Sequence, residues 1–303
     1  MNTVNPYLRK VENAAHPYNA KKISGEHLTP PLNAWFHFTS GNRIAPEVFI
    51  IGVQKGGTTS LAKYLFDHPQ VIQAQRKDIY YFNNAVNYKK GESWYRAHFA
   101  HRLYQRIHEF KKGVSNSITI DATPNYFVAP GAAERLKSMF PDAKLILMLR
   151  NPIERAWSNY RMMVWHGMET LDFEDAISAE EERIFNAENE CRINGTHNYV
   201  LQRLAYRKNG CYADFLPEWT SRFKPEQLLI LKSEDMFEKP SEVYNRVVEF
   251  CGLESYIYTA FDNPNKGKIE KDVPSEIRAA LKEFYKPYNE RLYTMLNRNF
   301  NWE

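Results

Sequence analysis

The fold is decided by the stretch Val48-Phe49-Ile50-Ile51-Gly52-Val53-Gln54-Lys55-Gly56-Gly57-Thr58-Thr59-Ser60-Leu61. Its first four residues form a continuous apolar run that is typical of a buried parallel strand. Leu61, Tyr64 and Leu65 then recur at helical spacing, so the turn between strand and helix falls on residues 52–57. Glycines in such a turn let backbone amides approach an anion, and the new helix points the positive end of its dipole there. The stretch therefore predicts a phosphate-binding loop.

The loop differs from the nucleoside triphosphate pattern G-x-x-x-x-G-K-[ST], because Lys55 precedes the paired glycines and Thr58 follows them. The pattern Q-K-G-G-T-T-S resembles instead the 5′-phosphosulfate loop of sulfotransferases that use 3′-phosphoadenylyl sulfate (PAPS). The plainer alternative is a tight turn between a strand and a helix. The resemblance implies that the 5′-phosphate is bound by Lys55, Gly56, Gly57, Thr58, Thr59 and Ser60.

A second segment, residues 144–160, also runs from an apolar strand through a turn into a helix. Pro152 suits the first helical position, where its missing N–H costs nothing. Arg150 ends the strand, and Ser158 follows about two helical turns later. The segment resembles the sulfotransferase 3′-phosphate motif R-x-P-x-x-R-x-x-S-x-Y, which implies that Arg150 and Ser158 bind one phosphate.

The sequence R-K-D-I-Y-Y-F-N at residues 76–83, followed by G-E-S-W-Y from Gly91, resembles a segment of the heparan sulfate (glycosaminoglycan) branch of PAPS-dependent sulfotransferases. In that branch the carboxylate of E-x-x-F-F is the general base, which implies this role for Asp78. A base within hydrogen-bond reach makes the acceptor hydroxyl a better nucleophile. Asp78 is one methylene shorter than the usual glutamate. Its alternative role is a solvated carboxylate paired with Lys77 or Arg76.

Residues 121–126, D-A-T-P-N-Y, resemble the E-K-T-P-x-Y of the same branch. Ala122 stands where glycosaminoglycan sulfotransferases carry an active-site lysine, which weakens the expectation of a heparan sulfate acceptor. The same strand, ending in Asp121, is also compatible with a kinase or ATPase in which this carboxylate binds magnesium. His166 is an alternative base, since other sulfotransferase branches use histidine.

A third cofactor segment, N-P-N-K-G-K at residues 263–268, resembles the K-G-R loop that folds over PAPS. The resemblance implies that Lys266, Gly267 and Lys268 contact the cofactor. Lys268 replaces the arginine of that loop and so lacks the forked guanidinium group that can form two parallel hydrogen bonds. Tyr258 or Phe261 is a candidate to stack on adenine, and the sequence does not choose between them.

Composition narrows the class of protein. The chain has 303 residues, 43% of them hydrophobic, and a formal net charge of +4, which fits a globular enzyme with an anionic substrate and is too small for a nucleic-acid-binding footprint. Three widely spaced cysteines indicate no zinc site and no disulfide framework. With no long apolar segment in the sequence, we expect a cytoplasmic protein. The basic residues of 94–112 suit either a solvated helix face or a wall for an anionic acceptor.

We expect an α/β fold, a three-layer P-loop-like domain with a central parallel sheet flanked by helices. The sheet is predicted to contain residues 48–51, 118–120, 145–149 and 228–231, with a further strand possible at 71–75. Residues 1–45 are predicted to be an N-terminal extension and 46–303 the catalytic domain. Helices at 274–286 and 288–297 close the chain.

The expected reaction is metal-independent transfer of the sulfuryl group from PAPS to a hydroxyl, or less readily an amine, of a saccharide or other small acceptor. Lys55 neutralises the leaving oxygen in this scheme and Asp78 is the base. Two alternatives remain at this stage: a P-loop kinase or ATPase, and a catalytically silent nucleotide-binding module. The resemblance is to soluble, bacterial-type members of the family, and the oligomeric state is open.

Overall fold

A five-stranded parallel sheet forms the centre of the computed structural model, which describes residues 36–194, 199–261 and 272–302. Every neighbouring pair of strands is parallel, and the strand order is β2-β3-β1-β4-β5. The strands are β1 (Val48–Gly52), β2 (Val71–Ile72), β3 (Ile118–Ala122), β4 (Lys144–Leu149) and β5 (Leu228–Lys232). The predicted α/β fold with a central parallel sheet is confirmed.

The edge strand β2 is shorter than the run predicted at residues 71–75. The chain leaves the sheet after Ile72, and the amide of Gln75 donates instead to the carbonyl of His98, at 2.9 Å. A backbone donor that finds a partner outside the sheet ends the ladder.

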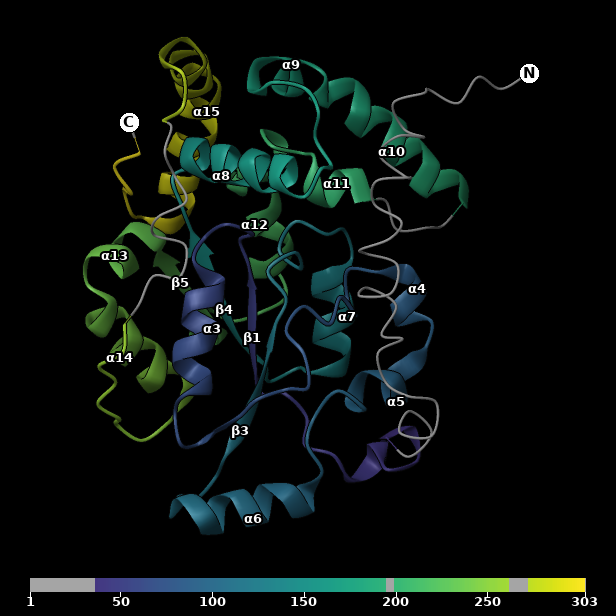
Figure 1. Ribbon diagram of the computed structural model, residues 1–303, viewed down its shortest axis with the longest axis vertical. Coiled ribbons are helices and arrows are strands. Elements are labelled where there is room, and N and C mark those ends of the chain that lie inside the picture. Colours follow the sequence, from purple (N-terminus) through teal and green to yellow (C-terminus); the bar gives the residue numbers. More distant parts are fainter. Residues whose placement is uncertain (1–35, 195–198, 262–271, 303) are drawn as a thin grey trace.

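Alternating side chains of β1 belong to two separate hydrophobic cores. Val48 and Ile50 pack on one face of the sheet, against α3 (Thr58–Phe66) and α14 (Pro240–Cys251). Phe49 and Ile51 pack on the other face, against α7 (Ala132–Met139) and α12 (Tyr212–Thr220). Figure 1 shows helices on both sides of the sheet. The sheet is therefore the middle of three layers, as expected for a parallel sheet buried on both faces.

A third core lies beyond the carboxyl ends of the strands, where α8 (Pro152–Trp165) crosses the top of the sheet (Figure 1). Asn151 caps α8 by accepting from the amides of the next turn, and Pro152 occupies the first turn as predicted. The other helices packed there are α9 (Phe173–Ser178), α10 (Glu180–Asn194), α11 (Tyr199–Arg203) and α15 (Ser275–Leu296).

The two predicted C-terminal helices are one continuous helix, α15, which contains Pro287. Proline removes one intrahelical hydrogen bond and normally breaks a helix. Here Leu281 and Tyr285 are buried before the proline and Leu292 after it, so packing on both sides holds the helix together. The prediction of a break was wrong because it rested on local preference alone.

The remaining described elements are η1 (Ser40–Asn42), α4 (Ala85–Tyr88), α5 (Gly91–Arg96), α6 (Arg102–Lys112), η2 (Lys208–Gly210), η3 (Pro225–Gln227) and α13 (Ser233–Glu238). Cys211 and Cys251 are buried free thiols. Among the described helices, none combines the length and the apolar character that crossing a bilayer demands.

The close packing at the end of β1 can be tested with Gly52→Ala. A Cβ at Gly52 would lie 2.7 Å from Cβ of Phe127 and 2.9 Å from Cδ1 of Leu147, two groups held in the core. We expect the substitution to lower the free energy of unfolding by about 1–3 kcal/mol, the usual cost of overpacking. Gly41→Ala is the matched control, because a Cβ there meets nothing within 4 Å. Urea denaturation should show a clear loss for the first variant alone, and equal stability of the two would contradict the packing described.

Candidate functional site

The loop between β1 and α3 is held in place by close contacts with β4 and α13. A Cβ at Gly56 would come within 2.7 Å of the carbonyl oxygen of Met148 in β4, so only glycine fits. The hydroxyl of Ser233, at the start of α13, donates to the carbonyl of Gly56 at 2.7 Å. Lys55 (φ 72°) and Gly57 (φ 86°) adopt left-handed conformations that turn the chain into α3.

The structure shows which amides of this loop are available to an anion. Gly56 donates its N–H to the carbonyl of Val53, and Ser60 donates to the carbonyl of Gly57. Within the described chain the amides of Gly57, Thr58 and Thr59 have no backbone acceptor. Of the predicted amide donors 56–60, the first and the last are used inside the loop. Three donors remain at the positive end of α3.

Lys55 lies inside this loop among other cations. Burial, followed by the nearby charges of Arg150, Lys77 and Arg161, lowers the pKa of its ammonium group from 10.5 to about 8. Its Nζ lies 3.7 Å from the sulfur of Met162 in α8. Half-buried cations that repel one another beside a helix N-terminus favour a bound anion, which would relieve the repulsion.

Arg150 is held where β4 ends. Its Nη1 donates to the backbone carbonyl of Lys55 at 3.0 Å, and its own carbonyl accepts from the hydroxyl of Tyr212 at 2.8 Å. Burial lowers the pKa of its guanidinium. The two predicted phosphate motifs are therefore in direct contact, although 95 residues separate Lys55 from Arg150.

Ser158 is half-buried on α8, one helical turn before Met162, which contacts Lys55. Residues three and four apart share one helix face, so Ser158, Arg161 and Met162 lie on the face turned toward the loop. Sequence analysis missed Arg161. Its position three residues after Ser158 was the signal that could have identified it.

Lys77 is a second cation that sequence analysis did not assign to the phosphate site. Its Nζ donates to Oγ1 of Thr59 at 2.7 Å, at the first turn of α3. Sequence analysis considered it only as a partner of Asp78. The structure attaches it to the loop instead.

Asp78 lies next to the same loop. Its amide donates to the carbonyl of Ala122 at 3.1 Å, at the end of β3, and Ala122 is in register with Ile50 of β1. Its own carbonyl accepts from Nη2 of Arg76 at 3.0 Å. The half-buried carboxylate of Asp78 is thus positioned at the carboxyl ends of the two central strands, where parallel sheets bind ligands.

The backbone around Asp78 is strained. Asp78 (φ 60°) and Tyr80 (φ 55°) are both left-handed, which is unusual for a residue as bulky as tyrosine. The hydroxyl of Tyr80 accepts from Arg203 at 3.1 Å, and the amide of Ile79 donates to Oγ1 of Thr123 at 3.1 Å. Strain of this kind persists where the surroundings enforce it, and it is concentrated at functional sites.

Asp121 is enclosed by hydroxyl groups. Tyr95 and Tyr126 each donate to its Oδ2 at 2.8 Å, and Thr123 donates to its Oδ1 at 2.6 Å. The residue is completely buried, which raises the pKa of the carboxyl to about 6. Its oxygens face the core, so Asp121 is not placed to bind magnesium beside a nucleotide, and the kinase or ATPase alternative loses the residue it required.

The remaining candidates from the sequence are the three residues of the K-G-K loop, two aromatic residues and His166. Lys266, Gly267 and Lys268 lie outside the described residues. Tyr258 and Phe261 pack on each other with ring centroids 4.9 Å apart. The hydroxyl of Tyr258 also donates to Asp67 at 2.9 Å. His166 caps the carboxyl end of α8, with its ring 4.6 Å from that of Trp165.

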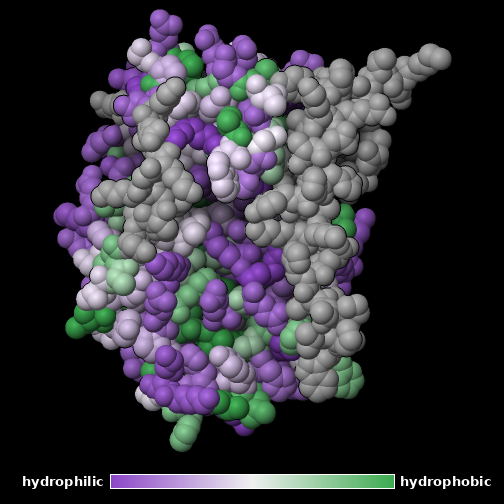
Figure 2. Space-filling model, viewed as in Figure 1, coloured by the Kyte–Doolittle hydropathy of each residue, from purple (hydrophilic) through white to green (hydrophobic). Residues whose placement is uncertain are grey.

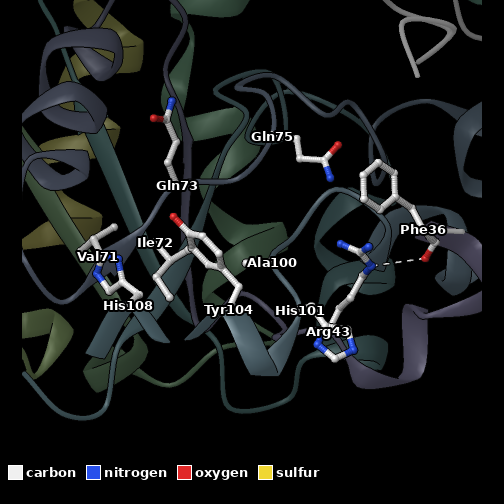
Figure 3. A pocket seen from close by; sticks show the side chains of 10 residues that line it. All are labelled: Phe36, Arg43, Val71, Ile72, Gln73, Gln75, Ala100, His101, Tyr104 and His108. Atoms are coloured by element: carbon white, nitrogen blue, oxygen red, sulfur yellow. Dashed lines mark hydrogen bonds between the residues drawn. The ribbon is translucent and has the colours of Figure 1, made fainter. Parts of the chain in front are cut away.

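A groove of about 410 Å³ lies away from the phosphate loop (Figure 3). It borders β2, which pairs with the first two residues of β3 and so lies toward the amino ends of the strands. Its lining consists of Phe36, Arg43, Val71, Ile72, Gln73, Gln75, Ala100, His101, Tyr104 and His108. None of the predicted site residues lines this groove.

Comparisons with known proteins show what this chain is similar to. A family model described as a sulfotransferase domain matches residues 45–285. Human heparan sulfate glucosamine 3-O-sulfotransferase 3B1 is 28% identical over 296 residues, covering 90% of this chain and 68% of that protein. Mouse heparan sulfate glucosamine 3-O-sulfotransferase 5 is 27% identical, covering 85% of this chain and 74% of that protein. The crystal structure of a sulfotransferase from Alicyclobacillus acidocaldarius is similar with a TM-score of 0.65 at 27% identity, covering 85% of this chain and 98% of that one.

The position of Lys55 predicts a pH-dependent cost in stability. At about pH 7 the lysine is protonated in both the folded and the unfolded chain, so the full cost of burying it is present. Between about pH 8 and pH 10.5 the folded protein loses the proton first, and this cost disappears. Lys55→Met should therefore raise the free energy of unfolding by up to about 3 kcal/mol at neutral pH, with the gain shrinking as pH rises.

Chemical denaturation of both proteins between about pH 7 and pH 10.5 measures this difference. Lys63→Met is the matched control, because Lys63 is an exposed lysine on the same helix. A gain for Lys55→Met that does not change with pH would contradict the assigned cause.

Proposed function

The chain belongs to the sulfotransferase domain family, and on that premise we propose that its sulfuryl donor is PAPS, bound between the β1–α3 loop and the start of α8. The observation that carries the proposal is the cluster of cations at the positive end of α3, where burial and then repulsion by its neighbours lower the pKa of Lys55. Such a cluster binds a ligand with several negative charges more favourably than one with a single charge.

The donor's two phosphate groups have separate sites in this proposal. The amides of Gly57, Thr58 and Thr59, with Lys55, bind the 5′-phosphosulfate. Arg150 and Ser158 bind the 3′-phosphate, and the resemblance adds Lys266, Gly267 and Lys268, outside the described residues, as cofactor contacts. The hydrogen bond between Arg150 and the backbone of Lys55 supports this division, because it fixes the spacing between the two phosphate sites.

In the proposed reaction the acceptor oxygen attacks sulfur in line with the departing phosphate oxygen. The new S–O bond forms as the old one breaks, and adenosine 3′,5′-diphosphate leaves. Lys55 stabilises the negative charge that develops on the leaving oxygen. Asp78 accepts the proton of the acceptor hydroxyl, and its location at the end of β3 supports this role. His166 remains the alternative base.

We further propose that the acceptor is a saccharide hydroxyl. The relatives described above are named for 3-O-sulfation of heparan sulfate glucosamine. The paired aromatics of the E-x-x-F-F-like segment, Tyr81 and Phe82, do not bear on this choice, because both are buried and pack on Tyr95. Ala122 lacks the positive charge that glycosaminoglycan sulfotransferases carry at the matching position, which favours an acceptor with fewer anionic groups.

A catalytically silent nucleotide-binding module is the second candidate, favoured only by the shorter carboxylate at Asp78. It predicts nucleotide binding without turnover. Measurement of sulfuryl transfer therefore separates it from an active enzyme.

Calorimetric titration with adenosine 3′,5′-diphosphate tests the donor site. We expect metal-independent binding that Lys55→Ala and Arg150→Ala each weaken by about tenfold to a hundredfold, since each removes a charged hydrogen-bond partner worth about 1.5–3 kcal/mol. Lys63→Ala, an exposed lysine of α3, should bind as the native protein does. Tighter binding of ADP with magnesium, or no effect of Arg150→Ala, would reject the proposed site.

Sulfuryl transfer from labelled PAPS to a glucosamine-containing oligosaccharide tests the base. Asp78→Asn should lower kcat by about 10²–10⁴-fold while leaving the affinity for adenosine 3′,5′-diphosphate unchanged, because a general base acts only in the transition state. Asp78→Glu should retain most activity, and His166→Gln should resemble the native enzyme. If His166→Gln is the inactive variant, histidine is the base.

A further inference from the structure

Helix α6 is attached to the protein by its polar side. Nε2 of Gln105 donates to the carbonyl of Ser117 at 2.7 Å, and Oε1 of Glu109 accepts from the amide of the same serine at 2.8 Å. Nε2 of His108 lies 2.7 Å from the carbonyl of Pro69. Gln105, His108 and Glu109 are spaced three and four residues apart, so they form one helix face. This face is turned toward the body of the protein.

The opposite face of α6 is apolar and exposed. Leu103, Ile107 and Phe110 follow the i, i+4, i+7 spacing of a single helical stripe, and they are 60%, 44% and 89% exposed. None of the eleven residues of α6 is buried. An amphipathic helix on a soluble protein normally turns its apolar stripe inward, so this orientation is inverted.

Cations border the apolar stripe on both sides. With about 100° of rotation per residue, Arg106 lies along one edge of the stripe and Lys111 along the other, and Arg102 lies further round the helix on the side of Arg106. Lys112 extends the charge at the carboxyl end, and Glu109, the one acidic residue of the helix, is bonded inward. Figure 2 shows hydrophobic side chains among hydrophilic ones along the lower edge of the molecule, where Figure 1 places α6.

We infer that α6 is a membrane-docking helix that lies flat on an anionic lipid surface. Its apolar stripe is matched by the acyl region just beneath the headgroups, and its flanking cations are matched by phosphate groups on either side. Basic residues beside an apolar helix face are attracted to anionic lipid in particular.

The same charges disfavour the other possible occupants of this face. A second copy of the chain would bring Arg106 and Lys111 against their own counterparts, and like charges repel. A soluble anionic saccharide would pair with the cations but would leave Leu103, Ile107 and Phe110 in water. A lipid surface satisfies both parts of the helix.

The docked orientation leaves the catalytic site open. Helix α6 leads into the amino end of β3, whereas the phosphate loop follows the carboxyl end of β1, and these strands are parallel. The two features therefore lie at opposite ends of the sheet (Figure 1). The groove of Figure 3 runs beside α6, with Tyr104 and His108 on its wall, so it lies on the membrane-proximal part of the protein.

Co-sedimentation of the full chain with lipid vesicles tests the inference. We expect binding to phosphatidylcholine vesicles that contain about 30% phosphatidylglycerol, little binding to pure phosphatidylcholine, and a decrease in binding at about 0.5 M salt. Phe110→Glu should reduce the partition coefficient by about tenfold or more. Arg106→Gln combined with Lys111→Gln should reduce it for anionic vesicles.

Phe185→Glu is the matched control, because Phe185 is 65% exposed on α10, away from α6. It should bind vesicles as the native protein does. Circular dichroism and binding of adenosine 3′,5′-diphosphate should be unchanged in every variant, so a failure of the docking helix is distinguishable from a failure of the donor site. Absence of vesicle binding, or binding that Phe110→Glu leaves intact, would overturn the inference. Concentration-dependent dimerisation that Phe110→Glu abolishes would assign the face to a second copy instead.

Discussion

Repulsion among cations at the positive end of α3 is the constraint on which the site depends. The structure holds Lys55, Arg150, Lys77 and Arg161 close enough for their charges to lower the pKa of the buried lysine. These residues come from the loop after β1, the end of β4, the segment after β2 and the second half of α8. Such an arrangement costs stability unless an anion is bound, and proteins retain costs of this kind at functional sites. The parallel sheet makes it possible because it brings the carboxyl ends of distant strands to one edge.

The buried carboxylate of Asp121 holds the segment that carries Asp78 in place. Asp121 accepts from Tyr95, Tyr126 and Thr123, and Thr123 in turn accepts from the amide of Ile79, next to Asp78. The strained segment that carries Asp78 is therefore tied to the core through a network whose members are all hydrogen-bonded. A satisfied network of this kind is rigid, which suits the role of general base proposed for Asp78. The role of Asp121 is thus to position the segment.

The proposed donor site and the proposed docking helix α6 lie at opposite ends of the parallel strands. The described residues of the proposed donor site lie toward the carboxyl ends of the strands, and α6 lies at the amino end of β3. A protein that docks through α6 would keep its donor and acceptor in water while confining the reaction to a lipid surface. Restricting an enzyme to a surface raises its effective concentration for acceptors displayed there.

The parallel sheet, the glycine loop after its first strand and the family could be predicted from the sequence, because each follows from local patterns: an apolar run, glycines before a helix, and an arginine with a serine two turns later. The sequence did not reveal that the amides of Gly56 and Ser60 donate to carbonyl groups inside the loop, since those hydrogen bonds depend on the geometry of the turn. Continuity of α15 through Pro287 and the burial of Asp121 were likewise decided by packing between segments remote in sequence. The same is true of Lys77 and Arg161, which become part of the site only when β2, α3 and α8 come together. The amphipathic pattern of α6 was visible in the sequence, but only the tertiary structure decided that its polar face turns inward, because Ser117 and Pro69 offer hydrogen-bond partners there.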